Sequence, residues 1–164
     1  MLSYSAAPIS LLYVEDDIVT GMILHRILSS TFSHLVIHTA HSGEDGIKMY
    51  REHGHDIVVS DIMMPGLDGM QMVREIQRLA PETLCIFTTA KTGDANFLVQ
   101  AQKLSRMRLY FKPTDCSELI RGIRECIDTI MTRRSRTLLF SMNFQGAVAD
   151  NRVTRRARQS RFSL

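Results

Sequence analysis

The chain has 164 residues, of which 45% are apolar, and this is enough to bury the core of one domain. No apolar run approaches the ~20 residues of a membrane-spanning helix, and the N-terminus lacks the basic region of a signal peptide. Its three cysteines, Cys85, Cys116 and Cys126, show no disulfide-framework or metal-site spacing. These features disfavour secreted and membrane-inserted proteins, and we expect a cytoplasmic protein with buried free thiols at Cys85 and Cys126.

The net charge of +3 is an average over two unlike parts of the chain. Residues 133–164 contain eight arginines and one acid, a charge of +7, whereas the rest carries 12 basic and 16 acidic residues, a charge of −4. We therefore expect one domain in residues 1–132. Residues 133–164 are expected to form a basic C-terminal tail, or the start of a linker, with little order.

The first half of the chain alternates short apolar runs with segments of helical spacing. Strands are predicted over Ile9–Val14, His34–Ala40 and Ile57–Ser60. Helices are predicted over residues 18–28 and 42–54. The third strand is apolar on both faces, which is typical of a central parallel strand covered by helices.

The second half continues this alternation after a loop at residues 65–69. Strands are predicted over Leu84–Thr88 and Leu109–Phe111. Helices are predicted over residues 70–79, 94–104 and 115–131. Five β/α units with right-handed crossovers indicate the α/β class, with a doubly wound parallel sheet.

A polar position follows four of the five apolar runs: Glu15-Asp16, Asp61, Thr89 and Lys112. If the runs are parallel strands, these positions share the carboxyl edge of one sheet, where ligands bind in open α/β folds. Carboxylates about 4 Å apart repel each other by a few kcal/mol at an effective dielectric constant of roughly 20, so the acids need a counterion. Taken singly, the same acids are equally explained as helix caps and solvated loop residues.

Together, these residue types suit the binding of a divalent cation and a phosphoryl group. Carboxylate oxygens in a shallow site favour Mg²⁺, and Mn²⁺ should substitute for it. Asp61 is the candidate nucleophile because an aspartate can attack phosphorus to form an acyl phosphate. Lys112 supplies a cation for phosphoryl oxygens, and Thr89 supplies a hydroxyl donor.

Four stretches together resemble one known family: residues 11–17 (LLYVEDD), 61–69 (DIMMPGLDG), 89–90 (TA) and 112–113 (KP). They closely resemble the CheY-like receiver domain of two-component response regulators, in the right order and spacing, over about residues 9–131. The resemblance implies a flavodoxin-like fold, a five-stranded parallel sheet of order 2-1-3-4-5 with helices on both faces.

The resemblance also implies a role for each site residue. Asp61 would accept a phosphoryl group from a sensor histidine kinase or a histidine phosphotransfer protein and would switch the binding of a downstream target. The Mg²⁺ ligands would be Asp16 and Asp61 directly, Glu15 through water, and the backbone carbonyl of Met63. Thr89 and Lys112 would contact the phosphoryl oxygens. Such a protein is not an enzyme beyond the phosphorylation and dephosphorylation of its own Asp61.

Two departures from the family pattern concern the last predicted strand and the segment before it. The family usually has an aromatic switch residue three positions before the lysine, where this chain has Leu109. Tyr110 is adjacent but should face the opposite side of the strand. Residues 105–108 (SRMR) also replace small and acidic residues that are frequent in the family. Neither departure touches the phosphorylation chemistry.

Two other functions remain open from the sequence. A haloacid-dehalogenase-like phosphatase would also use Asp61, but it needs a second acid two residues later, where Met63 stands. A phosphorylation-independent binding module would use the arginine-rich tail to bind nucleic acid. Metal binding by His34, His38 and His41 is not expected, since no metal-site spacing relates them.

Overall fold

A computed structural model of the protein describes residues 7–89, 107–112 and 116–159, with side chains described as far as residue 140. The chain divides into two compact units, Met1–Ile127 and Asp128–Leu164. Within the described residues, no helix is both long and apolar enough to span a bilayer.

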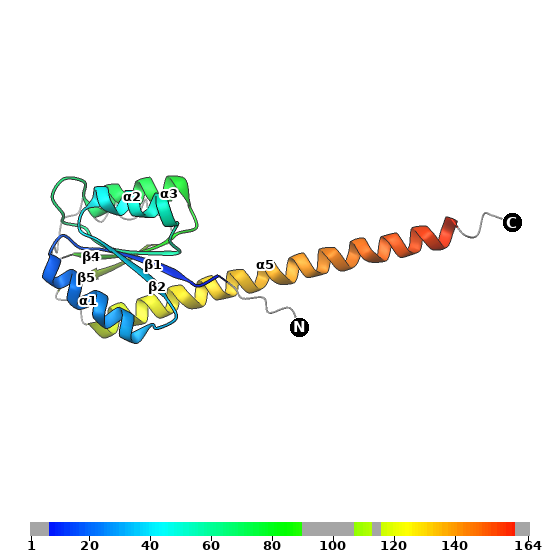
Figure 1. Ribbon diagram of the computed structural model, residues 1–164, viewed down its shortest axis with the longest axis horizontal. Coiled ribbons are helices and arrows are strands. Elements are labelled where there is room, and N and C mark those ends of the chain that lie inside the picture. Colours follow the sequence, from blue (N-terminus) through cyan, green and yellow to red (C-terminus); the bar gives the residue numbers. More distant parts are fainter. Residues whose placement is uncertain (1–6, 90–106, 113–115, 160–164) are drawn as a thin grey trace. The chain divides into compact units, whose positions relative to one another are not determined.

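The first unit is built on one five-stranded sheet (Figure 1). Its strands are β1 (Ser10–Val14), β2 (Val36–Ala40), β3 (Ile57–Asp61), β4 (Leu84–Thr89) and β5 (Met107–Phe111). All neighbouring pairs are parallel, and their order is β2-β1-β3-β4-β5. The predicted flavodoxin-like fold is therefore confirmed, including the reversal of strand order beside β1.

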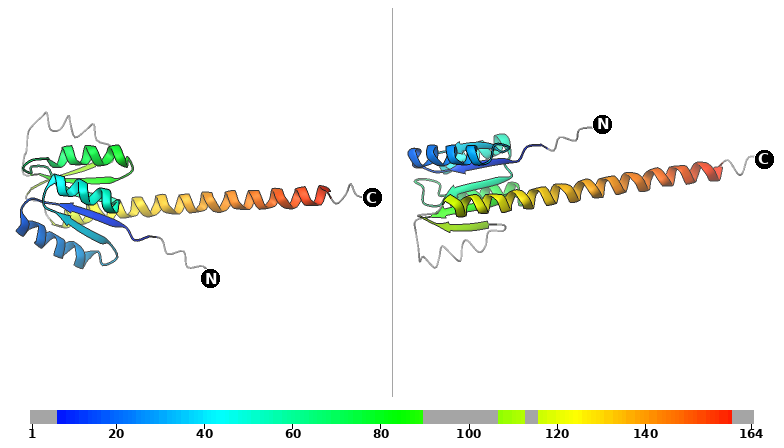
Figure 2. Two further views of the ribbon diagram at one scale, coloured as in Figure 1. Left: turned by 45° about the horizontal axis from the view of Figure 1, so that its top comes forward. Right: turned by 90° about the horizontal axis from the view of Figure 1, so that it is seen from below.

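Helices cover both faces of this sheet (Figures 1 and 2). They are α1 (Ile18–Thr31), α2 (Gly43–His53), α3 (Gly69–Leu79) and α5 (Cys116–Gln159). Helices α2 and α3 lie on one face, and α1 with the first turns of α5 lies on the other. The helix predicted over residues 94–104 falls outside the described residues.

Side-chain oxygens cap three of these helices. The Asp17 carboxylate accepts from the Thr20 N–H at the start of α1, and the Ser42 hydroxyl accepts from the Asp45 N–H at the start of α2. Asp68 and Gln71 form a reciprocal capping box at the start of α3. The caps at Asp17 and Ser42 begin helices that follow β1 and β2 after three and two residues, whereas seven residues separate β3 from α3.

The core lies between the sheet and the two helices α2 and α3. Strands β3 and β4 are buried along their whole length, as expected for central strands of a covered parallel sheet. The core cluster combines strand residues with the buried stripe of α3: Leu12, Val14, Val58, Cys85, Phe87, Met72, Val73 and Ile76. Cys85 and Cys126 are buried free thiols, as predicted, whereas Cys116 is exposed.

The last helix is longer than the sequence analysis predicted. The helix was expected to end near residue 131, but α5 continues to Gln159. The expectation that residues 133–164 form a basic tail or the start of a linker stays a prediction. The composition is compatible with this continuation, because residues 114–164 contain no proline and their most frequent residue, arginine, is a good helix former.

Candidate functional site

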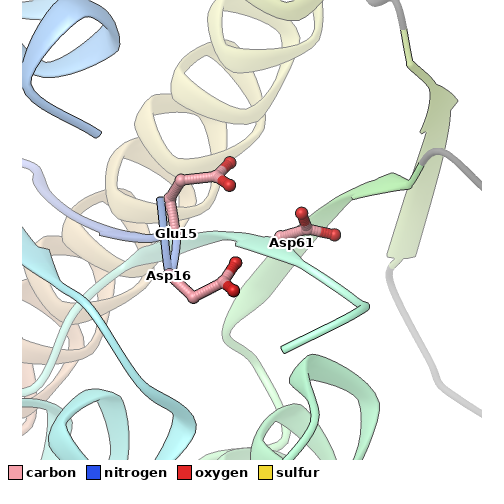
Figure 3. Close-up of side chains that lie close together, drawn as sticks. All are labelled: Glu15, Asp16 and Asp61. Atoms are coloured by element: carbon pink, nitrogen blue, oxygen red, sulfur yellow. The ribbon is translucent and has the colours of Figure 1, made fainter. Parts of the chain in front are cut away.

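Three carboxylates meet at the carboxyl edge of the sheet (Figure 3). Glu15 and Asp16 directly follow β1, and Asp61 is the last residue of β3. Because β1 and β3 are adjacent and parallel, one carboxylate oxygen from each of the three residues lies within 4.8 Å of the others. Glu15 and Asp61 are only 2% and 7% exposed, and Asp16 is the most accessible of the three.

Lys112 provides the positive charge that these acids require. It follows β5, and its Nζ lies 2.5 Å from Asp61 Oδ2 and 3.0 Å from Glu15 Oε2. Burial by itself lowers the pKa of the Lys112 ammonium, but its hydrogen bonds with Asp61 and Glu15 outweigh that effect and leave the pKa above its ordinary value. The ammonium therefore stays charged and acts as an internal counterion for two buried carboxylates.

The sequence analysis missed the support that Glu15 receives from Tyr13. The Tyr13 hydroxyl donates to Glu15 Oε2 at 3.0 Å, and the Tyr13 ring is fully buried. Burial, and after it the charge of Glu15, raises the pKa of the Tyr13 phenol, so it remains a donor. Tyr13 and Glu15 are two residues apart in an extended segment, where such residues share one face. This spacing could have predicted their contact from the sequence.

The Asp61 carboxylate is oriented by a backbone donor from its own loop and by the Lys112 side chain. Its Oδ1 accepts the Met63 N–H at 3.0 Å, while its Oδ2 accepts from Lys112. The carbonyl oxygen of Asp61 accepts the Ser60 hydroxyl at 2.6 Å. Both carboxylate oxygens are therefore held, which fixes the direction in which this side chain faces.

The loop after Asp61 is tied down by Gly69 at the start of α3. The Gly69 N–H donates to the carbonyl of Ile62 at 3.1 Å. A β-carbon at residue 69 would overlap the Asp61 carbonyl oxygen and would come within 2.7 Å of Ser60 Oγ. Glycine is needed here for this close approach of two backbones.

Thr89 and Met63 are the remaining predicted site residues. Thr89 ends β4 at the same edge and is 1% exposed, and its carbonyl accepts the Lys112 N–H at 2.6 Å. The backbones of these two residues are therefore connected directly. Met63 belongs to the loop after β3, and its side chain is 55% exposed. A role for the Thr89 hydroxyl on a phosphoryl group, and for the Met63 carbonyl on a metal, stays a prediction.

The donor set fits a hard divalent cation. Three carboxylates that converge from two strand ends offer oxygen ligands only, and the accessible Asp16 leaves room for metal-bound water, as Mg²⁺ prefers. A cation at this point would take over part of the charge that Lys112 now balances. The ammonium could then turn toward an incoming anion without leaving the acids unpaired.

The chain was compared with protein families and with curated proteins. The family model for the response regulator receiver domain matches residues 11–124. The transcriptional regulatory protein AfsQ1 of Streptomyces coelicolor is 40% identical over 90 residues, which is 55% of this chain and 39% of that protein. The transcriptional regulatory protein GlrR of Escherichia coli is 32% identical over 124 residues, 76% of this chain and 27% of that protein.

A third curated relative carries a different name, which is that of an enzyme. The protein-glutamate methylesterase/protein-glutamine glutaminase of Desulfitobacterium hafniense is 32% identical over 108 residues, 66% of this chain and 28% of that protein. The matched region thus spans between 27% and 39% of these three relatives.

Solved structures match most of the chain. A two component transcriptional regulator AraC from Clostridium phytofermentans is similar with a TM-score of 0.68 and 27% identity, over 76% of this chain and 96% of that one. A response regulator receiver domain protein from Clostridium thermocellum is similar with a TM-score of 0.67 and 25% identity, over 76% and 98% of the two chains.

Proposed function

Because this chain belongs to the response regulator receiver domain family of two-component systems, we propose that its Asp61 accepts a phosphoryl group from a phosphohistidine. The donor is a sensor histidine kinase or a histidine phosphotransfer protein. The observation that carries this proposal is the position of Asp61, a buried carboxylate that lies beside two other acids and forms a 2.5 Å ion pair with Lys112.

In the proposed reaction, an oxygen of the Asp61 carboxylate attacks the phosphorus atom. The P–O bond forms as the P–N bond to the donor imidazole breaks, and the bonding electron pair stays on the imidazole nitrogen. The product is an acyl phosphate on Asp61. The Met63 N–H and the Lys112 ammonium orient the carboxylate for this attack.

Mg²⁺, held by Glu15, Asp16 and Asp61 with the Met63 carbonyl, would neutralise charge on the carboxylates and on the incoming group. Mn²⁺ would serve in its place. Lys112 would turn from Asp61 Oδ2 to the phosphoryl oxygens, and the Thr89 hydroxyl would donate to them. Because the Lys112 N–H is bonded to the Thr89 carbonyl, a backbone shift at Lys112 would move the ends of β4 and β5 together.

The output of this chemistry is a change in the binding of a downstream partner, by a shift between two conformations that the phosphoryl charge biases. A surface for contact with the phosphoryl donor is available close to the site. Helix α1 begins three residues after Glu15, and it exposes Ile18, Val19, Met22 and Ile23, each by more than half. Such a group of exposed apolar side chains is typical of a protein-binding surface.

We do not propose catalysis on other substrates. A dehalogenase-like phosphatase needs a general acid at residue 63, and a methionine cannot transfer a proton there. The catalytic name of the methylesterase relative describes a protein of which only 28% is matched here. The kinase reaction draws on ATP inside the cell, and we propose a cytoplasmic location on that ground.

The test is the intact mass of the protein after incubation with acetyl phosphate, with and without Mg²⁺. We expect a gain of one phosphoryl group that requires Mg²⁺ and is absent in Asp61→Asn. Asp17→Asn is the matched control, because Asp17 is an exposed acid that caps α1 outside the cluster. This variant should be phosphorylated on Asp61 as the wild type is. A folded wild-type protein that gains no mass, or an Asp61→Asn protein that gains as much, would contradict the proposal.

A further inference from the structure

Three histidines gather away from the acidic cluster. His38 is in the middle of β2, His53 is the last residue of α2, and His55 lies two residues before β3. The phosphorylation proposal uses none of them. From the sequence, His38 was considered only together with His34 and His41. His53 and His55, on either side of Gly54, were not predicted to contact His38.

The three rings are in direct contact with one another. His38 Nδ1 lies 2.8 Å from His55 Nε2. The His53 ring is stacked on the His38 ring with a centroid distance of 4.5 Å and an interplanar angle of 29°. The centroids of His53 and His55 are 6.0 Å apart. Imidazoles from a strand, a helix end and a loop are therefore packed together, although their nitrogens do not converge as closely as the oxygens of the acidic cluster do.

His55 is also incompletely satisfied. It is 3% exposed, and its Nδ1 has no hydrogen-bond partner among the described residues. Leaving a buried polar atom unpaired is unfavourable, so packing alone does not explain a histidine at this position. A tyrosine ring, Tyr50, packs beside it at 5.9 Å between centroids, but the Tyr50 hydroxyl is bonded to Thr83 instead.

From this arrangement we propose that His38, His53 and His55 form a binding site for one transition-metal ion of the Zn²⁺, Ni²⁺ and Cu²⁺ class. Imidazole nitrogens favour these ions, whereas the carboxylates at the other site favour Mg²⁺. The two sites of this one domain thus differ in ligand type and select different metals.

Binding of the ion requires a rotation of the His53 side chain and a small separation of the other two rings. Zn–N bonds of about 2.0–2.1 Å in a tetrahedral site place two ligand nitrogens about 3.3 Å apart, roughly half an ångström more than His38 Nδ1 and His55 Nε2 are now. The proton that these nitrogens share moves to the far nitrogen of its own ring, so both lone pairs face the metal. His53 is exposed and turns about its side-chain bonds to present a nitrogen, and water completes the coordination.

The experiment is a Zn²⁺ titration of the full chain without a histidine tag, against a competing chelator and in excess Mg²⁺ to occupy the carboxylates. We expect one Zn²⁺ per chain and at least about tenfold weaker binding in His38→Gln and in His53→Gln, since even outer-shell losses weaken metal sites 10–100-fold. His34→Gln, an exposed histidine outside the cluster, is the matched control and should bind normally.

A second readout identifies the ligands directly. The Cu²⁺-loaded protein should show nitrogen hyperfine splitting in its electron paramagnetic resonance spectrum, and His53→Gln should reduce it. His53 is exposed at a helix end, so this variant keeps its fold even if replacement of the buried His55 does not. Unchanged Zn²⁺ affinity in either His38→Gln or His53→Gln, or a loss of Zn²⁺ binding in Asp61→Asn, would overturn the proposal.

Discussion

Lys112 is the residue on which the unphosphorylated site depends. It pairs with Glu15 and Asp61, two carboxylates that are almost fully buried and would otherwise repel each other. Removing one partner of a buried ion pair leaves an uncompensated charge, and this is more costly than the pair itself is favourable. The lysine thus has a structural role as well as its proposed role toward the phosphoryl group.

We expect Lys112→Met to lower the free energy of unfolding by about 1–3 kcal/mol without Mg²⁺, less than for a fully buried pair because the Lys112 side chain is 28% exposed. Mg²⁺ should restore much of this loss, since it binds the carboxylates that the lysine no longer balances. Urea denaturation with and without Mg²⁺ measures both effects. Lys48→Met, at an exposed lysine of α2, is the control, and an equal response of the two variants to Mg²⁺ would contradict the expectation.

The three cysteines should differ sharply in reactivity. Cys116 is exposed, whereas Cys85 and Cys126 are buried, and burial raises the pKa of the Cys85 thiol to about 12. Because the thiolate is the reactive form, raising the pH from 7 to 9 should not expose Cys85 to alkylation. Iodoacetamide should therefore add one label to the native protein and none to Cys116→Ser, and three labels to the wild type in denaturant. A second label on the native protein would show that the core opens readily.

At the scale of elements, the β3–α3 connection positions Asp61, the proposed nucleophile. Gly69→Ala places a methyl group against the Asp61 carbonyl and the Ser60 hydroxyl, so the loop must move. We expect a loss of about 2–4 kcal/mol, as for other overpacked or strained sites, and slower phosphorylation of Asp61. Thermal unfolding and the rate of mass gain with acetyl phosphate measure the two effects.

Gly54→Ala is the matched comparison for that variant. Gly54 has φ of +60°, but no atom lies within 4 Å of the place where its β-carbon would be. The substitution should therefore cost only the backbone strain of about 1–2 kcal/mol and leave the phosphorylation rate unchanged. If Gly54→Ala slowed phosphorylation as much as Gly69→Ala, general destabilisation rather than displacement of Asp61 would be the cause.

The β5 strand shows how a departure from the family pattern is accommodated. Leu109 packs against the core cluster, while the ring of the next residue, Tyr110, lies against Gly122 of α5. The two side chains thus face opposite sides of the sheet, as strand alternation predicted. Tyr110 cannot replace the missing aromatic residue without a twist of the strand, so any switch in this protein must operate with an aliphatic side chain at residue 109.

At the scale of the whole molecule, the chain combines an acidic part and a basic part. Deleting residues 133–164 changes the formal charge from +3 to −4 and leaves the site residues in place. We expect the shortened protein to accept a phosphoryl group at the wild-type rate and to lose any salt-sensitive binding of DNA, since that binding depends on the arginines. Phosphorylation assays and DNA binding at two salt concentrations test this. DNA binding that survives the deletion would assign it to the first unit instead.

The sequence by itself determined the alternation of strands and helices, the edge where the polar residues meet, and the family. These properties are carried by local patterns: side-chain periodicity, helix caps, and short motifs at strand ends. The strand order followed from the resemblance to the receiver family and not from periodicity, which carries no information about which strands are neighbours.

The tertiary structure alone decided the contacts between residues that are far apart in the chain or that share no motif. Lys112 is hydrogen-bonded to Glu15, which lies 97 residues earlier in the chain. His38 of β2 contacts His55, which precedes β3, although β1 lies between these two strands in the sheet. Such contacts depend on the packing distance and twist of whole elements, because a shift of one residue in register would turn the same side chains to the opposite face.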